Sequence, residues 1–133
     1  MGTAGNKIEY KFSEDKIIDE IKNYVDSTYQ GHYATNKYQA TDFIIDGGHG
    51  EGFCIGNILK YAQRYGKKDG KSRKDLLKII HYAMIAMHNH NLEAEKQMEE
   101  VADRTRENLQ HKIDSAIMTK NSQMILDLIN NER

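Results

Sequence analysis

Apolar residues recur along most of this chain at the spacing of an α-helix. In the first such stretch Ser13 serves as the N-cap, Gly31 ends the pattern, and the apolar positions between them lie three and four residues apart. These positions are Ile17, Ile18, Ile21, Tyr24 and Val25. We therefore predict a helix over residues 14–29. Residues 8–12 alternate between apolar and polar, which is a weak strand pattern within a loose arm of residues 1–12.

Two shorter helices are predicted on either side of a glycine-rich segment. Residues 38–45 form a short apolar helix, and a second helix runs from about Phe53 to Gly66, a residue suited to the left-handed conformation that closes a helix. Between them, residues 47–52 hold four glycines in six positions, which favours a flexible loop. A loop of this kind at the start of a helix presents free backbone N–H groups to an anion.

A much longer helix is predicted for the second half of the chain. From Lys74 to at least Gln110 the helical pattern meets no breaker, and the chain contains no proline. Such a helix would be roughly 55–60 Å long, which is more than a domain of this size is wide. It must therefore break near residues 88–91, or its distal half must pack on another subunit. A last amphipathic segment follows at residues 122–129.

Together these elements predict an all-α fold, a small helical bundle with one long helix in the C-terminal half. We divide the single domain of residues 1–133 into the arm (1–12), a core that carries the candidate site (13–91) and oligomerisation helices (92–133). In the last part, apolar residues three and four apart form a helix-packing seam. They are Met98, Val101, Ala102, Thr105 and Leu109. A monomer would leave this seam in water, so we expect a homo-oligomer built from two-fold pairs.

Composition and charge narrow the class of protein. No stretch reaches the roughly 20 apolar residues of a membrane span, and the one cysteine, Cys54, cannot form an internal disulfide. We therefore expect a cytoplasmic protein with no membrane partner. The net charge of −1 gives no overall positive field, so stable nucleic-acid binding is not expected.

The positive charge is concentrated in one part of the chain. Residues 60–78 carry eight basic and two acidic side chains. A solvated, charged turn is the ordinary explanation of such a run. Here the run follows directly on the glycine-rich segment and its helix, which favours a phosphate site.

Within this run, three side chains share one stripe of the predicted helix. Asn57, Lys60 and Arg64 are spaced by three and four residues. Arg64 can hold a phosphate through two parallel hydrogen bonds, while Lys60 acts as a mobile point charge. Lys67 and Lys68, at the end of the helix, can close over the distal phosphates. The stripe and these two lysines are our candidate phosphate site.

Other known site patterns fit less well. The glycine-rich segment is not a P-loop, because Phe53-Cys54 replaces the Lys-Ser/Thr pair of that motif. His81 and His88 lie seven residues apart on one helix face, but no further ligand follows at a metal-binding spacing. We therefore predict no metal site.

Several segments carry a resemblance to a known family. They are His32-Tyr33, Thr41-Asp42-Phe43-Ile44, Phe53-Cys54-Ile55-Gly56-Asn57-Ile58-Leu59-Lys60-Tyr61-Ala62-Gln63-Arg64-Tyr65-Gly66-Lys67-Lys68, Asp75-Leu76-Leu77-Lys78-Ile79 and His81-Tyr82. In this pattern the chain resembles a small phage-encoded family that includes the P-loop-less nucleotide kinase of short-tailed coliphages. Three departures are the missing proline before His32, a histidine, His81, where tryptophan is common, and a segment 47–52 that is richer in glycine than the family pattern.

The resemblance implies a phage protein of nucleotide metabolism, located in the cytoplasm of the infected cell and phosphorylating deoxynucleoside monophosphates. The candidate phosphate site would then hold the nucleotide, and His32 and Tyr33 would contact its base or a phosphate. Asp75 would orient a lysine or hold magnesium. Magnesium would enter with a nucleoside triphosphate, and no other cofactor is implied. No catalytic base is identified.

Two other functions stay open at this point. A binding protein without catalysis would use the same cations to sequester a nucleotide, for example a host immune signal. A kinase has to place a metal or a nucleophile near the phosphates, whereas a sequestering protein needs only cations and aromatic rings. A purely structural assembly factor would bind no small molecule at all.

Overall fold

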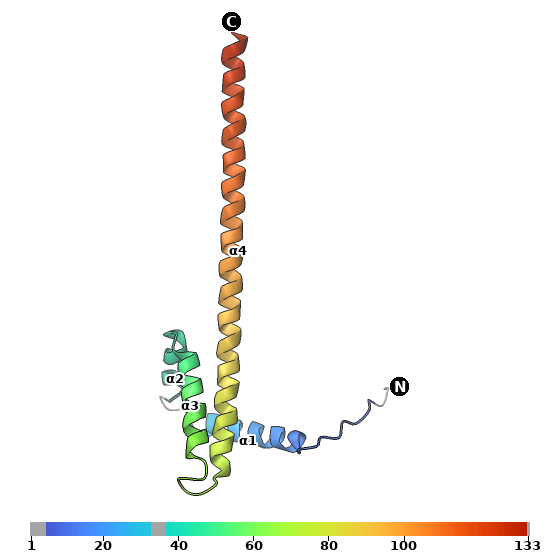
Figure 1. Ribbon diagram of the computed structural model, residues 1–133, viewed down its shortest axis with the longest axis vertical. Helices are drawn as coiled ribbons and strands as arrows, with labels where there is room; N and C mark the ends of the chain where they lie inside the picture. Colours follow the sequence, from blue (N-terminus) through green and yellow to red (C-terminus); the bar gives the residue numbers. More distant parts are fainter. Residues whose placement is uncertain (1–4, 33–36, 133) are drawn as a thin grey trace. The chain divides into compact units, whose positions relative to one another are not determined.

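The computed structural model describes residues 5–32 and 37–132, and it contains four helices in these ranges (Figure 1). They are α1 (Glu14–His32), α2 (Lys37–Asp46), α3 (Gly50–Arg64) and α4 (Arg73–Asn131). The predicted all-α fold with a long C-terminal helix is confirmed. The weak strand pattern of residues 8–12 was wrong, since the structure contains no strand in the ranges that it describes. An isolated strand has no partner for its backbone hydrogen bonds.

Some helix ends lie where the local sequence predicted them, and others do not. Gly66 has a φ of 83°, the left-handed conformation predicted for it, and it follows closely on the end of α3. Gly31 does not end α1, which continues to His32. α3 begins at Gly50, three residues before the predicted start, so the glycine-rich segment is partly helical.

The long helix has no break at residues 88–91. α4 is continuous over 59 residues and includes the segment 122–129 (Figure 1). The chain nevertheless divides into two compact units, Met1–His90 and Asn91–Arg133. Of the two alternatives for this helix, the break is absent. Packing of its distal half on another subunit stays a prediction.

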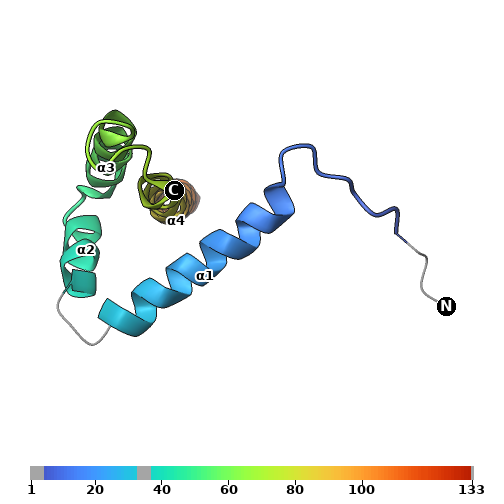
Figure 2. The same ribbon diagram turned by 90° about the horizontal axis from the view of Figure 1, so that it is seen from below.

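The first unit packs α1, α2 and α3 around the first turns of α4 (Figure 2). Among the described residues its buried apolar side chains are Ile21, Cys54 and Tyr61. Arg73 at the start of α4 donates two hydrogen bonds to the carboxylate of Glu20 on α1. Two edge-on aromatic contacts also join these helices to α4: Tyr24 of α1 with His81, and Phe53 of α3 with Tyr82. In addition, α2 packs directly on α3.

The first residue of α3 lies in close approach to α4. A Cβ atom on Gly50 would collide with the side-chain amide of Asn89, a residue of α4 that is 5% exposed, and would lie 2.8 Å from its Cγ atom. Only glycine permits this contact between the first turn of α3 and α4. The contact is tertiary, so the local sequence pattern did not reveal it.

The second unit consists of the remainder of α4. Every residue from 93 to 132 is exposed, including large apolar side chains such as Met98, Leu109 and Ile113. Within the ranges that the structure describes, no helix is both long and apolar enough to cross a membrane.

Candidate functional site

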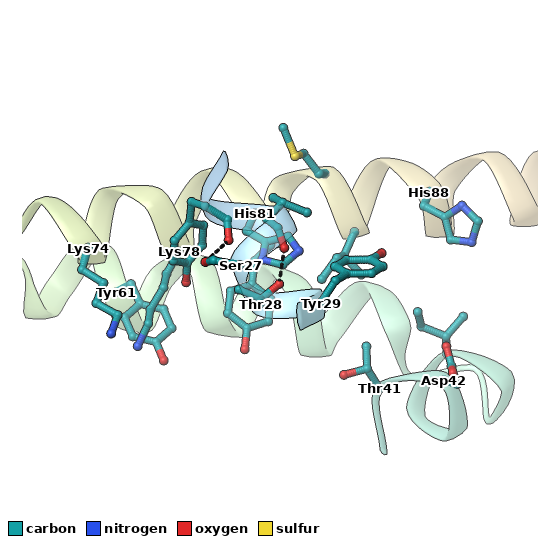
Figure 3. Close-up of a pocket in the computed structure, with 16 residues that line it drawn as sticks. Ser27, Thr28, Tyr29, Thr41, Asp42, Tyr61, Lys74, Lys78, His81 and His88 are labelled. Atoms are coloured by element: carbon teal, nitrogen blue, oxygen red, sulfur yellow. Dashed lines mark hydrogen bonds between the residues drawn. The ribbon is translucent and has the colours of Figure 1, made fainter. Parts of the chain in front are cut away.

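A cavity of about 680 Å³ lies in the first unit, and all four helices contribute to its lining (Figure 3). This volume falls within the usual range for small-molecule sites. The residues that line it are Tyr24, Val25, Ser27, Thr28, Tyr29, Thr41, Asp42, Ile45, Tyr61, Lys74, Lys78, His81, Tyr82, Met84, Ile85 and His88. His81 and His88 therefore face one cavity, as their spacing indicated.

The cavity has two chemically different ends. Figure 3 shows Lys74 and Lys78 with Tyr61 at one end, and Thr41 with Asp42 toward the other. Asp42 is the one carboxylate among the lining residues. A ligand with an anionic group at one end and hydrogen-bond donors at the other matches this polarity.

Four tyrosines, Tyr24, Tyr29, Tyr61 and Tyr82, line the cavity, and we call them the tyrosine wall. Tyr61 stacks on Tyr82 with ring centroids 6.0 Å apart and an interplanar angle of 15°. Tyr24 contacts His81 edge-on at a centroid distance of 6.0 Å. Such rings provide flat surfaces against which a heterocyclic base can stack.

Three cations surround the ring of Tyr61. The ammonium groups of Lys60 and Lys78 lie 4.6 and 4.7 Å from the ring centroid, and the guanidinium carbon of Arg64 lies 6.0 Å from it. Lys60 and Arg64 come from α3, whereas Lys78 comes from α4. We call these four residues the Tyr61 cluster. The structure thus brings two residues of the predicted stripe together with a lysine that lies 18 positions beyond Lys60 in the chain.

The pKa of the Tyr61 phenol is changed by these positive charges. Burial by itself would raise its pKa, but the charges of Lys78 and Lys60, with hydrogen bonds to both, lower the pKa below its ordinary value. The net direction shows that positive charge outweighs desolvation at this ring. The same field attracts an anionic ligand.

Arg64 also pairs with two carboxylates. Its Nε atom lies 3.7 Å from Oδ1 of Asp75, and an NH2 nitrogen lies 3.7 Å from Asp69. The side chain of Asp75 is only 4% exposed, whereas that of Asp69 is 74% exposed. Asp75 therefore lies beside an arginine, and the hypothesis that it orients a lysine or holds magnesium stays a prediction.

The other predicted site residues are distributed around this cluster. The amide of Asn57 donates to the carbonyl oxygen of Phe53 in its own helix at 2.8 Å. Lys67 and Lys68 are exposed in the turn after α3 and do not line the cavity. His32 ends α1, but its side chain and all of Tyr33 lie outside the described residues.

The glycine-rich segment does not offer the free N–H groups that we expected. The backbone N–H groups of Gly47, Gly48 and His49 donate to carbonyl oxygens of α2 at 2.9–3.0 Å. These bonds close the C-terminal end of α2, whose last carbonyls otherwise lack partners. The expectation was therefore wrong for these three groups, and the positive charge of the site comes from side chains.

Burial sets the charge state of the central histidine. It lowers the pKa of His81 below the ordinary 6.5, so the imidazole is neutral at pH 7. A neutral imidazole can both donate and accept a hydrogen bond toward a ligand. Across the described part of the chain, no three His, Cys, Asp or Glu side chains are arranged to hold a metal ion.

Sequence reasoning missed most of the cavity wall. Asp42 and Tyr61 stand inside the motifs that carried the family resemblance, yet no role was given to either. Lys74 and Lys78 were counted only as part of the basic run. Their distance in sequence from α3 concealed that the fold places them at one end of the same cavity.

Comparison with known proteins identifies the family. The pattern described as a protein of unknown function, DUF3310, matches residues 9–84, which is more than half of the chain. This chain belongs to the DUF3310 family. The matched range contains the Tyr61 cluster and the lining residues of the cavity other than Ile85 and His88. No curated protein and no solved structure matches the chain.

Proposed function

We propose that this DUF3310 protein binds a nucleotide in the cavity, with the phosphates at the Tyr61 cluster and the base toward the tyrosine wall. The observation that carries the proposal is the pair of ammonium groups, Lys60 and Lys78, on the ring of Tyr61. Tyr61 and Lys78 line a nucleotide-sized cavity, and Lys60 lies beside them outside its lining. No ion pair within the described residues joins either lysine to a carboxylate. Their charge is therefore available to an anion.

Arg64 contributes to this site with a fixed orientation. Its Nε atom lies 3.7 Å from Asp75 and one terminal nitrogen lies 3.7 Å from the exposed Asp69, so a phosphate would compete with Asp69 for the terminal nitrogens of the guanidinium. Asp75 is in this proposal a positioning residue for Arg64. Lys67 and Lys68 act from the exposed turn and are expected to reach only the distal phosphates of a longer ligand.

We further propose that the protein acts in phage nucleotide metabolism as a kinase of deoxynucleoside monophosphates. Phosphoryl transfer depends mainly on positioning and on neutralising charge, which clustered cations provide. The resemblance to the phage nucleotide kinase family supports this activity. Magnesium would accompany the triphosphate donor.

A second function, nucleotide sequestration without catalysis, is favoured by the position of Asp75. This carboxylate is buried beside Arg64 and is not among the residues that line the cavity. A sequestering protein requires the Tyr61 cluster and the tyrosines, but no catalytic carboxylate.

A thermal-shift screen with mononucleotides, triphosphates and cyclic nucleotides tests binding. A ligand at 100 times its Kd adds about 2.7 kcal/mol to the free energy of unfolding. Lys60→Ala and Lys78→Ala should each weaken binding by roughly 1.5–3 kcal/mol, the range for charge-assisted hydrogen bonds. Lys120→Ala, in the exposed second unit, is the control. Equal affinity in all four proteins would exclude the site.

Arg64→Ala alone is a poor test, because it leaves the buried Asp75 without its partner. The double variant Arg64→Ala/Asp75→Ala removes both charges and separates a loss of binding from a loss of folding.

Turnover decides between the two functions. Each nucleotide that binds is incubated with ATP and magnesium, and the products are analysed for the diphosphate. A kinase yields diphosphate at a rate that falls in Lys60→Ala. Tight binding with no product from any common monophosphate would establish sequestration instead.

A further inference from the structure

The exposed part of α4 repeats its apolar and small residues every eleven positions. Between residues 94 and 116 the intervals are four, four and three, taken twice. The positions are Ala94, Met98, Ala102, Thr105, Leu109, Ile113 and Ala116, which we call the hendecad stripe. An eleven-residue repeat averages about 3.67 residues per turn, close to an unstrained α-helix, so the stripe stays on one side of the helix.

The stripe is suited to contact with another helix. Met98, Leu109 and Ile113 are 74%, 54% and 52% exposed. The hydroxyl of Thr105 donates to the carbonyl oxygen of Val101 at 2.8 Å, so this polar group already has a partner in its own helix. The alanines of the stripe let a second backbone approach closely.

The same interval continues in the upstream sequence. Leu76, Met87, Met98 and Leu109 are eleven residues apart, and so are Ala83, Ala94, Thr105 and Ala116. A repeat maintained over this length is typical of a helix that packs lengthwise on a partner with a matching repeat.

We propose that the hendecad stripe packs against the same stripe of a second copy of this chain, and that the two helices run antiparallel. The charged residues bordering the stripe carry this choice. Glu95 and Arg106 are eleven residues apart and border the same edge, while Val101 and Lys112 border the other edge. In an antiparallel pair, the edge that carries Glu95 and Arg106 lies against the same edge of the second copy. Glu95 of each copy therefore faces Arg106 of the other. Parallel copies would place Arg106 beside Lys112, two like charges.

This pairing fixes the register. The two-fold axis passes midway between residues 95 and 106, next to Val101, so Val101 meets its own counterpart. Met98 then lies opposite Ala102 of the second copy, a large side chain against a small one. The near-straight repeat predicts only a slight right-handed twist of the pair.

Light scattering at micromolar concentration is the first test. We expect a mass that is a multiple of 15.3 kDa. A mass of one chain overturns the proposal. Val101→Glu, which would place two carboxylates against each other at the axis, should lower the mass.

Cysteine cross-linking tests the direction and register. Val101→Cys should form a disulfide-linked dimer under mild oxidation, whereas Leu109→Cys should not, because residue 109 lies about 25 Å from its counterpart in the antiparallel pair. Cross-linking of both variants indicates a parallel pair and overturns the orientation. If neither variant cross-links, the proposed contact through the hendecad stripe is wrong. Wild type is the control, since its one cysteine, Cys54, is 0% exposed.

Charge exchange gives an independent measurement. Glu95→Arg should weaken association about tenfold, and the double variant Glu95→Arg/Arg106→Glu should restore it. Glu107→Arg makes the same charge change on the opposite side of the helix and should have no effect. If the double variant associates no better than Glu95→Arg, the proposed Glu95–Arg106 contact is absent.

Discussion

The two units of this chain are built from the same kind of helix but differ in what surrounds it. In the first unit, side chains from four helices converge on one cavity, and charged groups such as Asp75 are buried. In the second unit every residue from 93 to 132 is exposed, and its large apolar side chains face solvent. Chemistry requires groups from several elements, so the proposed nucleotide site belongs to the first unit. The second unit is suited to assembly.

Hydrogen exchange as a function of protein concentration should show the largest contrast. An exposed helix without a partner opens at a cost of about 0–1 kcal/mol, whereas a packed unit opens at several kcal/mol. On dilution, amide protection in residues 93–131 should fall while protection in α3 persists. If protection in the second unit is independent of concentration, its stability does not depend on a second copy.

Substitution of Asp75 should show how strongly the first unit depends on its buried charge. Asp75→Ala removes the enclosed partner of Arg64 and should lower the free energy of unfolding by about 2 kcal/mol, less than for a fully buried pair because Arg64 is partly exposed. Asp69→Ala removes the exposed partner of the same arginine and should cost about 0.5 kcal/mol or less. Urea unfolding measures both. Equal losses would mean that burial of Asp75 is unimportant.

The contact between α3 and α4 can be tested with a matched pair of glycines. Gly50→Ala should destabilise the protein by roughly 1–2 kcal/mol, because the new Cβ collides with Asn89. A Cβ atom on Gly52, two residues on in the same helix, would have nothing within 4 Å, so Gly52→Ala should stabilise by up to about 1 kcal/mol. Opposite signs in thermal melts are expected. Stabilisation by both variants would disprove the close approach.

The buried His81 predicts the smallest effect, a dependence of stability on pH. Because its pKa in the folded protein lies below 6.5, the unfolded chain binds more protons between these two values. Stability should therefore fall as the pH is lowered through 6.5, by at most about 1.4 kcal/mol per pH unit. His81→Gln should remove this part of the slope, whereas His111→Gln in the exposed unit should retain it. If His81→Gln leaves the slope unchanged, His81 is not the source of this pH dependence.

Features that depend on neighbouring residues could be predicted from the sequence. Gly66 takes the left-handed conformation just after α3, as predicted, because only a local steric rule is involved. The close approach of Gly50 to Asn89 could not be predicted, since the two residues are 39 positions apart in the chain. The strand pattern of residues 8–12 failed for a related reason, because alternation produces a strand only where a partner strand exists.

The candidate site divides in the same way. The spacing of Lys60 and Arg64 on one helix could be predicted from the sequence, and the structure places both at Tyr61. The addition of Lys78 and the pairing of Asp75 with Arg64 depend on how α4 packs on α3. The hydrogen bonds of residues 47–49 to α2 likewise required knowledge of the preceding helix.

The reactivity of the buried thiol of Cys54 can be used to measure local opening of this protein. Cys54 is 0% exposed, and burial also raises the pKa of its thiol, so an alkylating reagent reacts with it only when α3 separates from its neighbours. The rate of thiol labelling in native buffer therefore measures the free energy of that opening directly, without denaturant. A nucleotide that binds between α3 and α4 would slow the labelling in proportion to its occupancy. Every preparation of the wild-type chain thus contains a probe in α3, the helix that carries three of the four residues of the Tyr61 cluster.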